Sequence, residues 1–388
     1  MGASDAILYV DTKPALEALC ARLKGCTWLA IDTEFHREQT YYPQLCLLQI
    51  GTPDLVACID ALILTDLHPL LEVLYDPKIT KVMHAGRQDL EIFYHLCGEL
   101  PSPVFDTQIA ALLLGYPEQI SYAGLVSELL GIKLKKAYTR ADWTRRPLPA
   151  EQVRYAVEDA YYLAEIYRAM DKELRLRGRL AWLEEEFSAL ADPALYNNPP
   201  ECAWQRVSGS EQLHGREIPA LQVLAAWREQ TAREENRPRH WLIRDDTLVA
   251  LARQQPQTED ELRRINGLHP RIVQQYRRQI LGMIAQAKTQ PLLEHAPHRR
   301  AKRLTLTQEA IVDCLMAVVR LRAHEHGLNP IVLVSRKELE RLVCGEQGPR
   351  LYGWRQDIVG LDLIALLQGE LTLMMDQGKL LLKRINER

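Results

Sequence analysis

Three features that would assign the protein to other classes are missing from its 388-residue sequence. The eight cysteines form no Cys-x-x-Cys pair, and they are scattered as Cys20, Cys26, Cys46, Cys58, Cys97, Cys202, Cys314 and Cys344. This spacing predicts reduced thiols rather than a disulfide framework or a zinc site. No apolar stretch reaches the roughly 18 residues that a membrane span requires, and the N-terminus lacks a basic and apolar signal. We therefore expect a cytoplasmic protein that does not bind membranes.

An excess of positive charge is also missing, because 48 lysines and arginines face 51 acids and the formal net charge is -3. Nucleic-acid-binding proteins are commonly basic, so binding to a phosphate backbone would depend on local patches. The first patch contains Lys133, Lys135, Lys136, Arg140, Arg145 and Arg146, and the second contains Arg299, Arg300, Lys302 and Arg303. We expect the first patch to reach phosphates, whereas the second fits a solvated linker equally well. Trp143 in the first patch either stacks on a base or acts as a packing anchor.

Two acids, Asp32 and Glu34, follow the apolar run Trp28-Leu29-Ala30-Ile31, which is typical of the end of a buried strand. Residues i and i+2 of a strand point to the same face about 7 Å apart, so both carboxylates converge on one spot at the edge of a core. Ionising both is costly without a positive charge, and a divalent cation is a common source of that charge. For an isolated Asp-x-Glu, a polar turn after a strand is the alternative.

Two further motifs add polar side chains of the same kind. In His84-Ala85-Gly86-Arg87-Gln88-Asp89, an apolar run ends at a glycine and a helical pattern begins, which places Asp89 in the first turn of a helix. Tyr155 and Asp159 lie one turn apart on the same face of a proline-free helical pattern from Ala150 to Arg177. Each motif alone fits a solvated helix face or a helix dipole. Their order and spacing together favour a single site with four carboxylates.

The first half of the chain alternates strand and helix patterns, which indicates a mixed sheet flanked by helices. The expected strands are Ile7 to Val10, Trp28 to Ile31, Cys46 to Ile50, Leu55 to Ile59 and Ile79 to Met83. The expected helices are Pro14 to Leu23, Leu67 to Tyr75, Arg87 to Leu96, Thr107 to Leu114, Tyr122 to Leu130 and Ala150 to Arg177. Asp106 precedes one of these helices and is expected to be its N-cap.

Proline, asparagine and glycine interrupt every helical pattern between residues 190 and 215, which indicates a domain boundary. Beyond it the sequence is almost wholly helical, and it repeats weakly. Leu224 corresponds to Leu315 at an offset of 91 residues, and Trp241-Leu242-Ile243 corresponds to Val332-Leu333-Val334 at the same offset. The repeat predicts two small helical domains, one on each side of the basic segment that ends at Arg303.

The order Asp-x-Glu, then an Asp that opens a helix, then Tyr-x-x-x-Asp resembles the three exonuclease motifs of the DEDD superfamily in its tyrosine-bearing branch. The surrounding residues Asp32-Thr33-Glu34-Phe35, Tyr41-Tyr42-Pro43-Gln44-Leu45 and His84-Ala85-Gly86 are similar to bacterial ribonuclease D, and the resemblance extends over the chain. It implies a ribonuclease H-like α/β exonuclease domain followed by two all-α domains of the helicase-and-ribonuclease-D C-terminal (HRDC) type. The expected bounds are 1–195 for the exonuclease domain, 196–211 for a linker, 212–292 for the first HRDC domain, 293–303 for a basic linker and 304–388 for the second HRDC-like domain.

The resemblance also implies the chemistry. It predicts a 3′-to-5′ exoribonuclease that removes 3′ nucleotides from transfer RNA precursors and other small RNAs and releases nucleoside 5′-monophosphates. Asp32, Glu34, Asp89 and Asp159 would hold two divalent cations, with Asp32 bridging them and Asp89 acting through the waters of the second ion. Tyr155 would orient the attacking water. The all-oxygen ligand set favours Mg²⁺ or Mn²⁺ over zinc, and the nearby His36 and His84 are interpreted as packing residues.

For the RNA substrate, we expect stacking or phosphate contacts from Phe35, Tyr41, Tyr42, Lys135, Lys136, Arg140 and Trp143. No obligatory protein partner is evident. Two other functions remain as alternatives: a proofreading or repair exonuclease that acts on DNA, and a non-catalytic RNA-binding scaffold. The lack of a polymerase or helicase segment disfavours the first, and the intact set of five motif residues disfavours the second.

Overall fold

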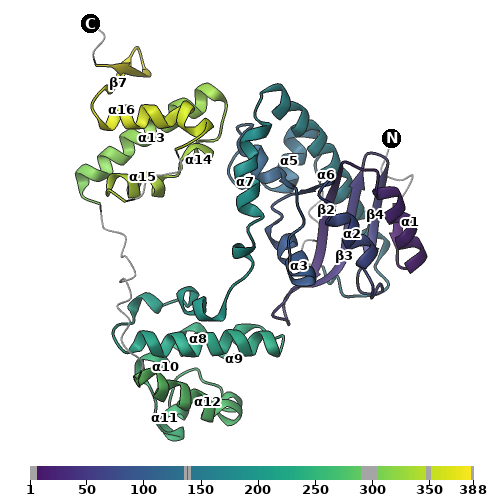
Figure 1. Cartoon of the computed structure of the whole chain (residues 1–388), viewed down its shortest axis with the longest axis vertical. Coiled ribbons are helices and arrows are strands. Elements are labelled where there is room, and N and C mark those ends of the chain that lie inside the picture. Colours follow the sequence, from purple (N-terminus) through teal and green to yellow (C-terminus); the bar gives the residue numbers. More distant parts are fainter. Residues whose placement is uncertain (1–6, 135–137, 139–140, 290–303, 347–350, 386–388) are drawn as a thin grey trace.

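The computed structural model describes residues 7–134, 138, 141–289, 304–346 and 351–385, which form an α/β domain and two smaller helical domains (Figure 1). Within these ranges, no helix combines the length and the apolar character that crossing a membrane requires.

A six-stranded mixed sheet in the order β1-β4-β3-β2-β5-β6 forms the centre of the α/β domain, which confirms the predicted fold class. Strands β2, β3 and β4 make an antiparallel meander, β1 pairs parallel with β4, and β5 and β6 extend the sheet in parallel beyond β2. The strands are β1 Ile7–Val10, β2 Trp28–His36, β3 Gln44–Thr52, β4 Leu55–Asp60, β5 Thr80–Met83 and β6 Val104–Asp106. The prediction omitted β6, because three residues are too few to show an alternating pattern.

Helices cover both faces of the sheet. On one face lie α1 (Lys13–Leu23), α2 (His68–Leu74) and α3 (Arg87–Cys97), and on the other lie α4 (Thr107–Leu112), α5 (Tyr122–Leu130) and α6 (Ala150–Leu176). In β2, Leu29 and Ile31 pack in the core of the first face, whereas Ala30 packs in the core of the second. Because side chains alternate along a strand, Asp32 and Glu34 share the face of Ala30 and point toward α6.

Strand β2 is longer than the sequence predicts. We expected it to end at Ile31, but its pairing with β3 continues to His36 through a β-bulge between Glu34 and Phe35. The two acids therefore lie within the strand rather than after it. The cross-strand hydrogen bonds to β3 outweigh the low strand preference of the acids.

Helix α6 approaches the sheet closely at Gly51 on β3. A Cβ atom at this position would lie 2.4 Å from the backbone oxygen of Ala160, well inside the 3.4 Å at which ordinary contact begins. Glycine is therefore required for α6 to lie at this distance from the sheet. Ala156 and Ala160, both fully buried, form the side of α6 that faces the sheet. The contact fixes the position of the helix that carries Tyr155 and Asp159.

A series of short helical turns connects α6 to the first helical domain. They are η1 Leu180–Trp182, α7 Leu183–Leu190, η2 Pro193–Leu195, η3 Pro200–Arg206 and η4 Ser210–Gln212. Part of the segment that we expected to be a linker is packed, because Ala203 and Val207 are buried in the core of the first helical domain. That domain consists of α8 Glu217–Glu234, α9 Arg239–Leu242, α10 Asp245–Gln254, α11 Glu259–Arg263 and α12 Pro270–Thr289.

The second helical domain confirms the predicted repeat. Its elements are α13 Leu306–His326, α14 Pro330–Leu333, α15 Arg336–Val343, the π-helical turn η5 Gln356–Gly360 and α16 Leu361–Leu367. Helices α14 and α15 begin 91 residues after α9 and α10 respectively.

The domain departs from the expected all-α architecture at its end, where β7 (Leu371–Asp376) and β8 (Lys379–Arg384) form an antiparallel hairpin. Gln377 and Gly378 both have positive φ, as a two-residue hairpin turn requires.

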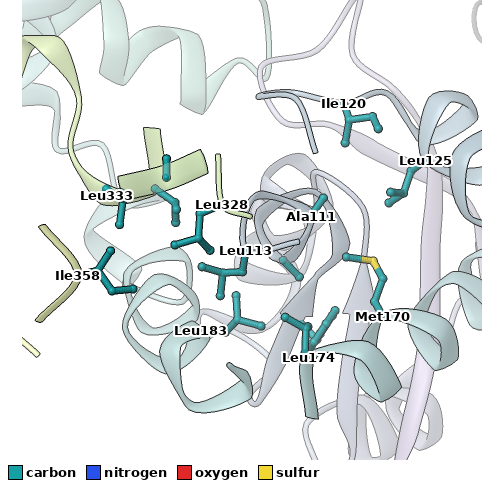
Figure 2. Close-up of a cluster of buried hydrophobic side chains, with 14 of the residues drawn as sticks. Ala111, Leu113, Ile120, Leu125, Met170, Leu174, Leu183, Leu328, Leu333 and Ile358 are labelled. Carbon is teal, nitrogen blue, oxygen red and sulfur yellow. The ribbon is translucent and has the colours of Figure 1, made fainter. Parts of the chain in front are cut away.

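Both helical domains contact the α/β domain. Leu328, Leu333 and Ile358 of the second helical domain share one hydrophobic cluster with Leu113 and Leu183 of the α/β domain (Figure 2). The rings of Trp182 and Trp354 stack in parallel with centroids 4.5 Å apart, and the backbone N–H of Asn329 donates to the carbonyl of Leu112 at 3.0 Å. The first helical domain contacts the loop between β2 and β3 through α8.

Candidate active site

Three carboxylates from β2 and α6 meet at one point. Asp32 and Glu34 project from β2 toward α6, and Asp159 projects from α6 toward the sheet. One oxygen from each of the three lies within 4.8 Å of the others, which is a suitable arrangement for a metal ion. A cleft of about 190 Å³ opens beside them and is lined also by His84, Tyr122, Tyr155 and Leu163. The structure therefore brings together three of the four predicted acids directly.

The fourth acid, Asp89, lies in the first turn of α3 as predicted and is 9 % exposed. Thr33 points to the opposite side of β2 from Asp32 and Glu34, and its hydroxyl donates a hydrogen bond to the Asp89 carboxylate. Asp89 is not part of the three-acid cluster but lies next to it across the strand. The charge of Asp89 acts on Asp32 and Glu34, so it lies near the cluster, and the family resemblance implies that it acts through metal-bound water.

The side chain of Asp106 holds the N-terminal ends of both α3 and α4. Its carboxylate accepts the backbone N–H groups of Gln108 and Ile109, which confirms the predicted N-cap of α4. It also accepts the N–H groups of Ala85 and Gly86, at 3.1 and 2.9 Å, in the turn before α3. Ala85 has a φ of 52°, and a Cβ atom on Gly86 would lie 2.6 Å from that of Met83. One buried acid thus stabilises the tight turn that presents Asp89.

The electrostatics of the cluster favour a bound cation. Burial, reinforced by the charge of Asp159, raises the pKa of Glu34 to about 8, and burial raises the pKa values of Asp159 to about 7 and Asp89 to about 6. Burial and the neighbouring acids also raise the pKa of Asp32. In the described part of the chain, no lysine or arginine forms an ion pair with any of the four. The all-oxygen donor set, buried and without a counter-charge, therefore fits a divalent metal ion.

Tyr155 is suited to donate a hydrogen bond rather than to accept a proton. Its hydroxyl is hydrogen-bonded to the Asp159 carboxylate one turn later on α6. Burial and the charge of Asp159 raise the Tyr155 pKa well above its ordinary value, so the phenol stays protonated at neutral pH. Tyr138 and Trp143 pack against its ring with centroids 5.7 and 6.3 Å away, which restricts the ring to this orientation.

Two cleft residues were not predicted as part of the site. Tyr122, at the start of α5, donates a hydrogen bond from its hydroxyl to the backbone carbonyl of Asp159. His84 directs Nδ1 to the hydroxyl of Thr107 at 2.9 Å, while its Nε2 atom has no hydrogen-bond partner. Neither residue has a distinctive spacing from the motifs. The only signal for His84 in the sequence was its place at the end of β5, two residues before the glycine turn.

The structure corrects several predicted substrate contacts. Trp143 is 4 % exposed and packs in the core beneath α6, so its role is that of a packing anchor and no face is free for a base. Phe35 follows the β-bulge and packs against the core on the opposite face of the sheet from Asp32. Arg146 does not face solvent as a phosphate ligand, because its guanidinium binds the buried Asp60 at 2.5 and 2.8 Å.

The tyrosine pair lies at a domain contact. The hydroxyl of Tyr41 donates to Glu229 on α8, and Asn236 accepts the backbone N–H groups of Tyr41 and Tyr42 at 3.1 and 3.2 Å. Tyr41 therefore attaches the β2–β3 loop to the first helical domain, at the edge of a cavity of about 860 Å³ that is separate from the cleft beside the acids. The remaining predicted contacts, Lys135, Lys136 and Arg140, and the second basic patch (Arg299, Arg300, Lys302 and Arg303), lie outside the described residues.

Comparison with known proteins agrees with this arrangement. The family model described as 3′-5′ exonuclease matches residues 7–175, and the HRDC domain model matches residues 218–284. The chain is 38 % identical to ribonuclease D of Sphingobium indicum, covering 97 % of this chain and 98 % of that protein, and 38 % identical to ribonuclease D of Zymomonas mobilis, covering 97 % and 98 %.

A solved structure has the same architecture over nearly the whole chain. The crystal structure of Escherichia coli RNase D, an exoribonuclease involved in structured RNA processing, superposes with a TM-score of 0.81 at 32 % identity. The match covers 94 % of this chain and 99 % of that one. With the carboxylate cluster on β2 and α6, and relatives that match from end to end, the chain belongs to the ribonuclease D family of 3′-to-5′ exoribonucleases.

Proposed function

We propose that the protein removes nucleotides one at a time from the 3′ ends of transfer RNA precursors and other small RNAs, releasing nucleoside 5′-monophosphates. The observation that carries the proposal is the meeting of Asp32, Glu34 and Asp159 within 4.8 Å, beside the protonated Tyr155. The E. coli relative, an exoribonuclease involved in structured RNA processing, supports RNA as the substrate.

Asp32, Glu34, Asp89 and Asp159 are proposed to hold two divalent cations, with Asp89 acting through bound water. The oxygen-only donor set supports Mg²⁺ or Mn²⁺. When bound, the cations neutralise the carboxylates, lower the pKa of a coordinated water and stabilise the charge on the leaving 3′ oxygen.

The chain's own residues supply the positioning. The rings of Tyr138 and Trp143 hold the Tyr155 ring in place. Without metal its hydroxyl donates to Asp159, and when a cation occupies that carboxylate the same proton is donated to the attacking water and orients it. Tyr122 restrains the backbone of Asp159, so the carboxylate keeps its place above β2. The Asp89 carboxylate is oriented by the hydroxyl of Thr33.

The test is a time course on transfer RNA labelled at its 5′ end and extended at its 3′ end, with Mg²⁺ or Mn²⁺ and with a chelator control. Wild type is expected to produce a metal-dependent ladder that shortens one nucleotide at a time, and Asp32→Asn is expected to produce none. A protein that binds the RNA without shortening it would contradict the proposal and favour the scaffold function. Faster shortening of single-stranded DNA than of RNA would favour the DNA exonuclease.

We also propose a cytoplasmic location. All eight cysteines are free in the structure, and Cys20, Cys46 and Cys58 are buried as thiols, which supports a reducing compartment.

A further inference from the structure

Gln49 is a buried polar side chain without a role in the site as described so far. It lies on β3 and is 0 % exposed, and neither its Oε1 nor its Nε2 atom has a hydrogen-bond partner. A buried amide that makes no hydrogen bond has a free-energy cost, because it has lost its bonds to water. A leucine or methionine of similar size would avoid this cost, so packing alone does not account for a glutamine at this position.

The sheet register places Gln49 directly opposite Asp32. The two residues are partners in the antiparallel β2–β3 ladder, between the pairs Ala30 with Gly51 and Glu34 with Leu47. Side chains of opposed residues in such a ladder lie on the same face, with Cβ atoms about 4.5–5.5 Å apart. Gln49 and Asp32 therefore stand side by side beneath α6.

The other neighbours of Gln49 on this face are poor hydrogen-bond partners. On its own strand the flanking residues are Leu47 and Gly51, and across β4 it is opposed by Cys58. Ala156 and Ala160 of α6 are buried with Leu47 and Cys58 in one apolar cluster. Among the described residues around this amide, the Asp32 carboxylate is the strong acceptor that the register puts beside it.

We propose that Gln49 is a positioning residue that acts through Asp32. Its side-chain amide donates a hydrogen bond from Nε2 to the Asp32 carboxylate when that carboxylate holds metal, which fixes the orientation of this ligand. The inference rests on the proposed function, because it assigns Gln49 to the metal site described there. Removing groups that orient a metal ligand typically lowers metal affinity by about 10- to 100-fold.

The test compares Gln49→Met, which keeps the length and removes the amide, with Gln152→Met as the matched control. Gln152 is a second buried glutamine whose Oε1 has no partner, on the first turn of α6 and not among the residues that line the acidic cleft. Mn²⁺ binding to the full chain is measured by titration calorimetry at low temperature, and the melting temperature is measured with and without Mn²⁺. Gln49→Leu is measured in parallel. Leucine also lacks the amide donor but has a different shape, so an effect common to both variants comes from the lost donor.

For both Gln49 variants, we expect the melting temperature without metal to be unchanged or raised, and Mn²⁺ affinity to fall by about 10-fold or more. The cleavage rate should recover at high Mn²⁺, and Gln152→Met should bind Mn²⁺ like wild type. A lowered melting temperature with unchanged Mn²⁺ affinity would make Gln49 a packing residue and overturn the inference. If wild type itself binds no Mn²⁺, the proposed metal site fails instead, so the two failures are distinguishable.

Discussion

Gly51 offers the sharpest test of how the fold sets the geometry of the site. In Gly51→Ala, the new Cβ atom would lie 2.4 Å from the backbone oxygen and 3.0 Å from the carbonyl carbon of Ala160. Ordinary contact begins at 3.4 Å, and both contacts are to backbone, so no side chain can rotate away. The helix α6 must therefore move away from the sheet by about 1 Å, the difference between 3.4 Å and the 2.4 Å to the Ala160 oxygen.

That displacement acts on the site directly, because α6 carries Tyr155 and Asp159 while Asp32 and Glu34 stay on the sheet. A misplacement of about 1 Å costs on the order of 100-fold in rate, so we expect kcat to fall by about that factor. Overpacking should also lower the free energy of unfolding by about 1–3 kcal/mol. The chain should remain folded, since the change is confined to one contact.

The assay measures initial rates on a short single-stranded RNA at saturating Mn²⁺, together with unfolding in urea. Gly282→Ala is the matched control, because Gly282 lies inside helix α12 and a Cβ atom there meets nothing within 4 Å. The control should keep full activity and gain about 0.5–1 kcal/mol, as expected for replacing glycine within a helix. A Gly51→Ala enzyme with wild-type kcat would refute the reasoning that this contact sets the distance between α6 and the sheet.

Three further outcomes are expected. Tyr155→Phe should lose most activity yet bind Mn²⁺ with unchanged affinity in calorimetry, whereas Asp32→Ala should lose both; full activity of Tyr155→Phe would count against an orienting role. Without metal, the native chain holds protons on Glu34 that the unfolded chain releases, so the melting temperature should fall as pH rises from about 4.5 to about 8. The stabilisation by Mn²⁺ should grow over the same range, and a stabilisation independent of pH would contradict the raised pKa values. Trp354→Ala should weaken docking of the second helical domain by about 1 kcal/mol, seen as faster proteolysis between the domains, and unchanged proteolysis would argue that the stacked pair is dispensable.

The motif residues were predictable because each depends on local periodicity. Asp32 and Glu34 share a face by the period of a strand, and Tyr155 and Asp159 share one by the period of a helix. The 91-residue repeat also predicted the starts of α14 and α15 from those of α9 and α10. In each case the information lies within a few residues or in a copy of the same pattern.

The unpredicted parts depend on contacts between distant segments. The hydrogen bond from Thr33 to Asp89 joins residues 56 positions apart, and the one from Tyr41 to Glu229 joins residues 188 apart. The residues around Trp143 in the sequence do not indicate whether its ring is buried or exposed. It is buried because α6, which is later in the chain, packs over its loop. The length of β2 was underestimated for the same reason, since β3 supplies the hydrogen bonds that extend it.

The hydrophobic cluster that joins the second helical domain to the α/β domain has an evolutionary consequence. Leu113 and Leu183 are buried in one cluster with Leu328, Leu333 and Ile358 of the second helical domain. A descendant that lost residues 304–388 would expose this apolar area to water, and selection against aggregation would replace those leucines with polar residues. The amino acids at these two positions in an isolated exonuclease domain would then record whether its ancestor carried such a C-terminal domain.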